Sequence, residues 1–333
     1  MLDFRLRLEK FLSARNQPVI IEQLTPDASV REYFRVQWNG KPAIACVYPE
    51  SFSAQEQSYL DVTNLFLNGN LPVAAIYDFD ESLAVIIQED FGDTILRDVL
   101  IKSDDEKREE LTNEAIGLIA KIQAATAKAY QLDSIASRLK FDEEKLFWEL
   151  NFFKTHYFET LLKSKFSEAD DKALTNEFVE LSEELEIRAK VLCHRDFHAA
   201  NLMIDKQNRL RIIDHQDARI GAATYDLVSL LLDRVTQTPD KHWLENKKNY
   251  FTNECKKLGL ETIAVQEFET EFQMQTVQRC LKAVGTFSFQ SVKRGKTYFV
   301  PFIEPMLVIV LEACKSLNRF PHLQTIVGKQ LNS

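Results

Sequence analysis

Residues 193–218 read CHRDFHAANLMIDKQNRLRIIDHQDA, and they carry the strongest structural signal in this chain. The first half contains two histidines, a carboxylate and an amide within the eight residues from His194 to Asn201. The second half holds two short apolar runs, 202–204 and 210–213, which flank a group of polar residues. Such a pattern predicts two strands joined by a tight turn. We therefore expect a polar loop followed by a β-hairpin.

A symmetric hairpin determines which polar residues face one another. With a four-residue loop at 206–209, Asn201 pairs with Asp214. Directly opposed residues of antiparallel strands have Cβ atoms roughly 4.5–5.5 Å apart. An amide oxygen and a carboxylate at that separation can share a hard cation such as Mg²⁺, which binds oxygen ligands and keeps several waters. Asp196 can reach the same place from the preceding turn.

This arrangement fits phosphoryl transfer. A metal neutralises nucleotide phosphates, while a nearby carboxylate accepts the proton of the attacking hydroxyl. The catalytic loop of protein kinases has the signature H-R-D-L-x-x-x-N, and His194 to Asn201 match it with Phe197 in place of leucine. The match indicates that Asp196 is a candidate base.

Other interpretations of the same residues are weaker. A zinc pair of His194 and His198 needs both rings on one helical face and a third ligand, and no third ligand stands out. We expect the His194 ring to hydrogen-bond the loop backbone, whereas His198 and His215 fit loop packing as well as substrate contact. Asp226 begins an apolar helix, and a structural role as a helix cap suits it at least as well as a catalytic one.

Composition restricts the class of protein. The chain of 333 residues is 45% apolar and 27% charged, values typical of folded globular proteins. Its net charge of −9 argues against nonspecific nucleic-acid binding, which relies on a basic surface. The five cysteines are scattered and odd in number, which favours free thiols in a reducing compartment over disulfides or zinc.

The segments that direct a protein to or across a membrane are not evident in the sequence. The first residues mix charges into each turn, unlike a secretory signal. No uninterrupted apolar run approaches the roughly 18–20 residues of a membrane span. A cytoplasmic protein with neither nucleic-acid nor membrane partners is expected.

The two ends of the chain differ in pattern. The first ninety residues predict helices at 1–15 and 53–69 and strands at 31–38, 42–48, 73–79 and 83–90. After residue 93, long helices are expected at 105–130, 141–165, 168–189, 223–235, 240–258, 265–288 and 299–317. The chain should therefore have a small strand-rich N-terminal lobe, residues 1–90, and a larger helical lobe, residues 91–333.

With these residues in place, the chain resembles the aminoglycoside-phosphotransferase-like kinases, which have a protein-kinase-like bilobal α+β fold and act on small molecules. Within them it is most similar to the bacterial cell-wall sugar kinases that phosphorylate the anomeric hydroxyl of N-acetylmuramate and N-acetylglucosamine. Three stretches carry this narrower resemblance: DASVREYFRV (27–36), IIDHQDARIGAATYDLVSLLLD (212–233) and QRCLKAVGTF (278–287). The third lies far from the catalytic loop, so it gives independent support.

The resemblance implies ATP and Mg²⁺ as cofactors and gives roles to several positions. Asp196 is implied as the catalytic base, with Asn201 and Asp214 as the metal ligands. The segment QEDFGD (88–93) looks like the hinge whose backbone meets adenine. The nucleotide is therefore expected beside Glu89 and Phe91.

The phosphate-binding part departs from the usual kinase pattern. No glycine occurs in residues 25–35, and the strand at 42–48 lacks the lysine that pairs with the α- and β-phosphates in most kinases. By the same resemblance, the cell-wall sugar kinases also lack that lysine. Backbone N–H groups with Ser29 and Arg31 can bind phosphate instead. The sequence leaves open whether the missing charge comes from Arg31, Arg35 or Lys41.

The acceptor site is expected in the helical lobe. Arg279 and Lys282 lie three residues apart on one face of the helix at 265–288, and SVKRGK (291–296) adds three further positive charges. Such a cluster suits an anionic sugar such as N-acetylmuramate, and a solvated helix end explains the same charges about as well. Asp217 is a further candidate for substrate contact.

The sequence thus predicts an ATP-dependent sugar kinase for N-acetylmuramate and N-acetylglucosamine in peptidoglycan recycling. The alternative enzyme is a kinase for another small alcohol, such as an aminoglycoside or a choline-like compound, and it predicts an acidic acceptor pocket. The alternative from another class is a nucleotide-binding pseudokinase, suggested by the absent glycine loop and strand lysine.

Overall fold

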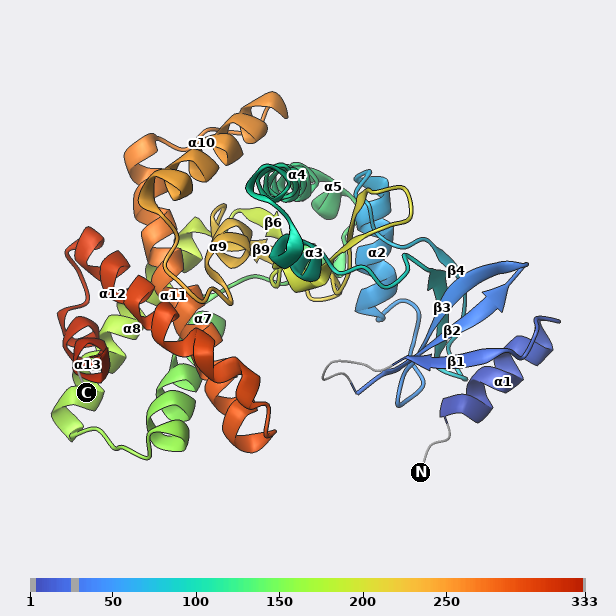
Figure 1. Ribbon diagram of the computed structural model, residues 1–333, viewed down its shortest axis with the longest axis horizontal. Helices are drawn as coiled ribbons and strands as arrows, with labels where there is room; N and C mark the ends of the chain where they lie inside the picture. Colours follow the sequence, from blue (N-terminus) through green and yellow to red (C-terminus); the bar gives the residue numbers. More distant parts are fainter. Residues whose placement is uncertain (1–3, 25–29, 332–333) are drawn as a thin grey trace.

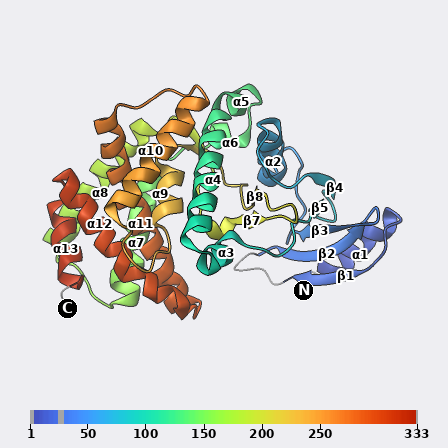
Figure 2. The same cartoon turned by 45° about the horizontal axis from the view of Figure 1, so that its top comes forward.

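The computed structural model describes residues 4–24 and 30–331, and it has a strand-rich lobe at the N-terminal end and a helical lobe at the C-terminal end (Figure 1). The α+β arrangement expected from the sequence is confirmed. The hairpin of the quoted stretch lies between the sheet and helices α3 (Leu96–Lys102) and α4 (Asp105–Ala124), as Figure 2 shows.

The N-terminal lobe is built on a five-stranded antiparallel sheet with the order β1-β2-β3-β5-β4. Its elements are α1 (Phe4–Ala14), β1 (Ile21–Leu24), β2 (Glu32–Trp38), β3 (Lys41–Val47), α2 (Ser58–Asn68), β4 (Ile76–Asp80) and β5 (Val85–Glu89). The side chains of β2 alternate as predicted, with Phe34 and Val36 buried in one cluster with Leu8 and Phe11 of α1. Helix α1 therefore covers one face of the sheet and leaves the other for Arg35 and its neighbours.

Helix α2 packs on the large lobe rather than on this small core. Its buried apolar side chains share one cluster with the C-terminal helices: Val62, Leu65 and Phe66. An isolated β-bridge between Val73 and Ile212 also joins the two segments, and a second bridge pairs Ile95 with Met203 within residues 91–333. Since part of the N-terminal segment shares its core with the second lobe, the division of the chain at residue 90 stays a prediction.

The C-terminal lobe surrounds two short β-ladders with helices. Its further helices are α5 (Thr126–Gln131), α6 (Ile135–Arg138), α7 (Glu143–Phe153), α8 (Glu168–Arg188), α9 (Tyr225–Leu232), α10 (Lys241–Lys257), α11 (Val265–Lys293), α12 (Ile303–Leu317) and α13 (Pro321–Leu331). The π-helix η1 (Lys154–Leu161) continues α7, and the 3₁₀ turns are η2 (Ala199–Asn201) and η3 (Thr297–Phe302). The ladders pair β6 (Val191–Cys193) with β9 (Arg219–Gly221) and β7 (Leu202–Ile204) with β8 (Leu210–Ile212).

Helix α11 is the central element of this lobe and contacts α7, η1, α9 and α12. At Gly285 it approaches α7 so closely that a Cβ atom there would lie 2.7 Å from the Cα of Phe153. Backbone atoms cannot move aside as a flexible side chain can, so the crossing requires glycine. The close packing brings Glu149 of α7 against Gln278 of α11, whose Nε2 donates to the carboxylate at 2.9 Å.

The expected helices differ from the observed ones mainly where the chain turns. The helix expected at 105–130 breaks at Ala125 into α4 and α5, and the one at 141–165 becomes α7 followed by η1. The helices α3, α6 and α13 were not predicted, because each is short or follows the last strongly periodic segment. The five cysteines are buried free thiols, which confirms the prediction from their spacing.

One expectation about membrane spans needs a correction. Among the described residues, the helical stretch Thr297–Leu317 is long and apolar enough, by length and composition alone, to cross a membrane. Single charges at Glu304 and Glu312 do not lower its hydropathy enough to exclude it. In the structure this stretch packs along α11 with Met306 and Val310 buried, as a core helix does.

Candidate active site

The loop after β6 is held by a buried carboxylate in the first turn of α9. Asp226 is fully buried and accepts the backbone N–H groups of His194 at 2.6 Å and Arg195 at 3.0 Å. Arg195 has a φ of +87°, a conformation that costs a non-glycine residue free energy. Burial raises the pKa of Asp226, and its hydrogen bonds with the loop oppose that rise. The sequence allows Asp226 to be either a helix cap or a catalytic group. Its contacts show that it positions the backbone of the loop at His194 and Arg195.

A second link joins this loop to the hairpin. The His194 ring donates from Nε2 to the carbonyl of Ile213 at 2.9 Å, which confirms the backbone contact expected of it. Ile213 directly precedes Asp214, so the link fixes the end of the hairpin relative to the catalytic loop. The described residues contain no group of three or more His, Cys, Asp or Glu side chains that could hold a metal.

The predicted register of the hairpin is wrong by one residue. The observed pairs are Leu202 with Ile212 and Ile204 with Leu210, and the N–H of Ile213 donates to the carbonyl of Asn201 at 3.1 Å. Asp205 causes the difference, because its carboxylate accepts backbone N–H groups two and four residues later and closes a shorter loop. Asn201 therefore lies opposite Ile213 and not opposite Asp214.

The two predicted metal ligands still lie at one end of the hairpin. Asp214 has a φ of +62°, which turns it out of the strand, and 45% of its side chain is exposed. Asn201 donates from Nδ2 to the carbonyl of Asp196 at 3.0 Å, a bond that engages its amide nitrogen and not its oxygen. An amide oxygen and a carboxylate fit Mg²⁺, which is usually bound through one or two carboxylates together with substrate phosphates and waters.

Asp196 lies among three cations. Its Oδ1 is 3.0 Å from Lys282 Nζ and 3.2 Å from Arg279 NH2, and its Oδ2 is 3.9 Å from Arg195 Nε. Burial by itself raises the pKa of Asp196, but the charges of Lys282, Arg279 and Arg195 outweigh it and hold that pKa well below the usual value. Asp196 is therefore ionised at neutral pH.

The two α11 cations expected at the acceptor site both contact Asp196. Arg279 is almost fully buried and also donates to Asp233 at 2.8 Å and Ser229 at 3.0 Å. Burial lowers the pKa of Lys282 and the charge of Arg279 lowers it further, while Asp196 opposes both. Whether either residue also contacts a substrate stays a prediction.

Asp217 pairs with Arg195, the residue before Asp196. Its Oδ2 is 2.8 Å from Arg195 NH1, and its Oδ1 is 3.9 Å from Arg219 NH2. We call the connected ion pairs the Asp196 network, made up of Arg195, Asp196, Asp217, Arg219, Asp233, Arg279 and Lys282. This network holds four cations and three carboxylates, a local positive surplus in a chain with a net charge of −9.

Of the three cations that the sequence suggests for phosphate binding, only Arg31 approaches Asp214. Its NH2 is 3.6 Å from Asp214 Oδ1, and its guanidinium lies over the rings of Tyr33 and Tyr48. Arg35 instead pairs with Asp90 and Asp93 of the segment 88–93, and Lys41 is exposed beside the turn between β2 and β3. Ser29 lies outside the described residues.

The hinge residues are tied to the hairpin by Arg211, which the sequence did not single out. Arg211 pairs with Glu89 at 2.7 Å and with Asp205 at 3.1 Å, and its guanidinium lies 3.8 Å from the centroid of the Phe91 ring. The side chains of Glu89 and Phe91 therefore hold the hinge against the hairpin. A hairpin arginine facing a hinge glutamate has no local sequence signal, because the partners are more than a hundred residues apart.

His198 and His215, left ambiguous by the sequence, differ in their surroundings. His215 is fully buried between Tyr59 and Phe66 and contacts Thr63 Oγ1 at 2.7 Å, so it packs α2 against the hairpin. Burial lowers the pKa of His215 to about 3 and that of His198 to about 4. Both rings are neutral at physiological pH.

The chain is similar in sequence to known phosphotransferases. The profile of the phosphotransferase enzyme family (APH) matches residues 20–258. An N-acetylmuramate/N-acetylglucosamine kinase of Neisseria meningitidis serogroup B is 28% identical over 84% of this chain and 81% of its own length. A protein of the same name from Pseudomonas putida is 26% identical over 89% of this chain and 83% of its own length.

Solved structures with the same fold are more distant in sequence. The aminoglycoside phosphotransferase APH(2'')-IIa, solved as a gentamicin complex, aligns with a TM-score of 0.61 at 13% identity, covering 97% of this chain and 98% of that chain. The choline kinase LicA from Streptococcus pneumoniae aligns with a TM-score of 0.58 at 12% identity, covering 92% and 98%. Because the family match spans most of the residues that build both lobes, the chain belongs to the phosphotransferase enzyme family.

Proposed function

We propose that this protein is an ATP- and Mg²⁺-dependent kinase that phosphorylates the anomeric hydroxyl of N-acetylmuramate and N-acetylglucosamine. The observation that carries the proposal is an ionised Asp196 inside a network with a surplus of positive charge. The names of the relatives from Neisseria meningitidis and Pseudomonas putida support the choice of sugar. We further propose that the protein works in the cytoplasm, in the recycling of peptidoglycan sugars.

Asp196 accepts the proton of the C1 hydroxyl in this proposal. The hydroxyl oxygen forms a bond to the γ-phosphorus, the bond from that phosphorus to the bridging oxygen breaks, and ADP leaves with the electron pair. Lys282 and Arg279, at 3.0 and 3.2 Å from the carboxylate, keep Asp196 ionised and fix its position. Asp226 sets the loop backbone through two hydrogen bonds, so the base is held before substrate arrives.

The nucleotide is assigned to the space between the sheet and the hairpin. Asn201 and Asp214 would hold Mg²⁺, which neutralises phosphate charge as the new bond forms. Arg31 supplies the charge of the absent strand lysine, since it is the cation that approaches Asp214. Ser29 is assigned to the phosphates, and the backbone around Glu89 and Phe91 to the adenine.

Charge separates this proposal from a kinase for cationic alcohols. An aminoglycoside or choline-like acceptor would need carboxylates in excess near the base, whereas the Asp196 network holds cations in excess. An amino sugar with a carboxylate, such as N-acetylmuramate, is attracted by that surplus. The pseudokinase alternative is disfavoured because the residues proposed as base, as oxygen ligands and as the phosphate-side cation are all present.

A substrate panel tests the proposal. N-acetylmuramate, N-acetylglucosamine, an aminoglycoside and choline are each incubated with ATP and Mg²⁺, and phosphorus NMR locates the transferred phosphate. We expect transfer to C1 of the two amino sugars. Turnover of choline or the aminoglycoside alone would refute the choice of substrate, and nucleotide binding without any turnover would favour the pseudokinase.

The base is tested with Asp196→Asn. We expect kcat to fall by orders of magnitude while ATP binding stays nearly intact. Asp133→Asn, which changes an exposed aspartate in the α5–α6 turn, is the matched control. Activity close to wild type in Asp196→Asn would contradict the assignment of Asp196.

A further inference from the structure

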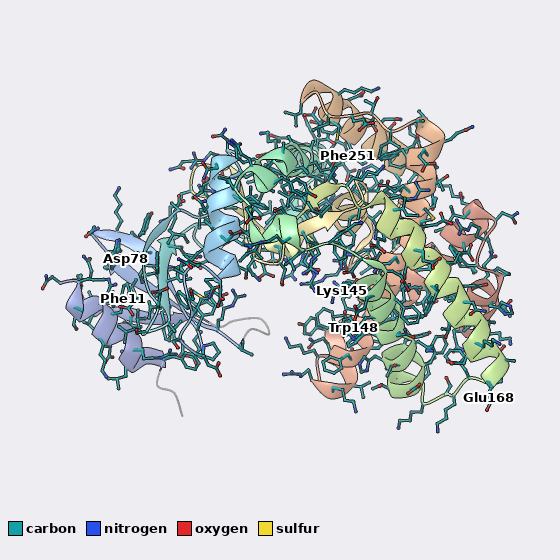
Figure 3. All side chains as sticks on the ribbon, turned by 180° about the vertical axis from the view of Figure 1, so that it is seen from behind. Phe11, Asp78, Lys145, Trp148, Glu168 and Phe251 are labelled. Carbon is teal, nitrogen blue, oxygen red and sulfur yellow. The ribbon has the colours of Figure 1, made fainter. Side chains whose placement is uncertain are left out.

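One face of α7 carries functional groups that the proposed chemistry does not use. Leu146, Glu149 and Leu150 face inward, and Lys145 and Trp148 lie on the adjacent stripe of the helix. Trp148 is 55% exposed, and it is the one tryptophan among the large exposed apolar side chains of residues 4–24 and 30–331. Figure 3 shows Lys145 and Trp148 on the side of α7 turned toward the strand-rich lobe.

The exposed indole is held in a fixed position. Lys145 Nζ lies 4.2 Å from the centroid of its ring, and Phe152 packs against it with ring centroids 5.4 Å apart. Phe152 in turn contacts His156 and Phe289. Phe152 and Lys145 therefore hold the indole in place for a ligand to pack on it, as the aromatic side chains that line ligand sites do.

This stripe lies beside the Asp196 network. Lys145 Nζ is 3.7 Å from Glu149, a buried carboxylate whose other oxygen accepts from Gln278, the neighbour of Arg279. Burial lowers the pKa of Lys145, and the nearby charges of Arg195 and Arg219 lower it further. Glu149 acts in the opposite direction and raises that pKa. Lys145 therefore lies between the catalytic loop and the exposed indole, with 28% of its side chain accessible.

We propose that Trp148 and Lys145 form the acceptor subsite, where the indole packs against the pyranose ring and the ammonium group pairs with the carboxylate of N-acetylmuramate. This rests on the proposed function and places the carboxylate at Lys145, whereas the sequence predicts it at Arg279 and Lys282. Arg279 and Lys282 both pair with Asp196. Lys145 is partly exposed, and its partner Glu149 also accepts a hydrogen bond from Gln278. The C–H groups of a pyranose carry partial positive charge, which suits the negative face of an indole ring.

The two residues should have separable effects on two sugars. Both sugars contain the pyranose ring, but only N-acetylmuramate has the carboxylate. Trp148→Ala should raise the KM of both sugars about tenfold or more and leave the KM of ATP within about twofold. Lys145→Met keeps the apolar stem, so it should raise the KM of N-acetylmuramate about five- to tenfold and leave N-acetylglucosamine nearly unchanged.

Matched variants and a binding measurement complete the test. Tyr130→Ala removes another exposed aromatic ring, and Lys121→Met removes another exposed lysine. Trp148→Phe retains an aromatic ring and should recover part of the affinity lost in Trp148→Ala. Without ATP, N-acetylmuramate should change the tryptophan fluorescence of the wild type and not that of Trp148→Phe.

The outcomes separate this inference from the proposed function. Unchanged sugar KM in Trp148→Ala, in a wild-type enzyme that phosphorylates both sugars, overturns the subsite and leaves the function standing. Equal effects of Lys145→Met on the two sugars overturn the carboxylate contact. If wild type phosphorylates no amino sugar, the function and the subsite fail together. Should Trp148→Ala not fold, Trp148→Phe and Lys145→Met supply the same comparison.

Discussion

Removing the charge of Lys282 should make the enzyme more sensitive to acid. Lys282→Met keeps the apolar stem and deletes the ammonium group that lies 3.0 Å from Asp196 Oδ1. The base must be deprotonated to accept a proton, and its pKa is now held well below the usual value by three cations that outweigh its burial. Losing one cation raises the pKa of Asp196. Activity should therefore start to fall at a higher pH as the solution is acidified.

The size of the shift follows from the distance and the exposure. Two unit charges 3.0 Å apart interact by about 1.4 kcal/mol in bulk water and about 5.5 kcal/mol at an effective dielectric constant of about 20. Asp196 keeps 27% of its side chain exposed, and Arg279 remains at 3.2 Å, so the lower part of this range applies. An interaction of about 1.4–2.8 kcal/mol corresponds to a pKa rise of about 1–2 units.

The assay compares kcat/KM for the sugar from about pH 3 to about pH 7 in wild type and Lys282→Met, because the pKa of Asp196 starts well below its usual value of about 3.9. The titration of ATP is common to both enzymes, so the ratio of the two profiles isolates the change at Asp196. Lys315→Met, which removes an exposed lysine from α12, is the control. The reasoning is refuted if the acid limbs of Lys282→Met, Lys315→Met and wild type coincide.

Three other variants test separate parts of the structure. Arg31→Met should raise the KM of ATP about 10- to 100-fold, the loss expected for a charge-assisted contact to phosphate, whereas the exposed Lys41→Met should not; equal values would reject Arg31 as the phosphate ligand. Asp226→Asn should lower stability by about 2–3 kcal/mol, or Tm by about 3–4 °C, and reduce kcat, because one loop N–H then faces an amide nitrogen; an unchanged melting curve would contradict the anchoring role. Gly285→Ala should cost about 1–3 kcal/mol in chemical denaturation, whereas Gly117→Ala, with no neighbour closer than 3.9 Å, should stabilise by about 0.5–1 kcal/mol; equal effects would mean that the α7–α11 crossing tolerates a methyl group.

The sequence predicted the parts of the fold that local patterns determine. The alternation in residues 31–38 follows from one face of β2 being buried against α1, and the Asn39-Gly40 turn joins β2 to β3 directly. The long helices of the second lobe were found because their buried faces repeat every three to four residues. The family resemblance supplied the arrangement of the lobes, which no local pattern carries.

The site was predicted less completely, for two physical reasons. The hairpin register depends on Asp205, whose side chain replaces a strand pair with hydrogen bonds inside the loop, and a count of loop residues cannot detect that. The role of Lys282 depends on how α11 packs against the catalytic loop. From the sequence alone, its charge suggested an acceptor contact, because nothing local indicates that Asp196 lies 3.0 Å away.

The low pKa of Asp196 also constrains which hydroxyl it can activate. A carboxylate held ionised by three cations is a weak base, and it accepts a proton most readily from an acidic donor. The anomeric hydroxyl of a sugar is more acidic than an ordinary alcohol, because the ring oxygen withdraws electrons from C1. In Lys282→Met, Asp196 is a stronger base. We therefore expect this variant to lose less activity toward a primary alcohol than toward the anomeric hydroxyl. The comparison is made at pH values where Asp196 is ionised in both enzymes. A uniform loss toward both acceptors would mean that Lys282 acts by positioning Asp196 and not by setting its basicity.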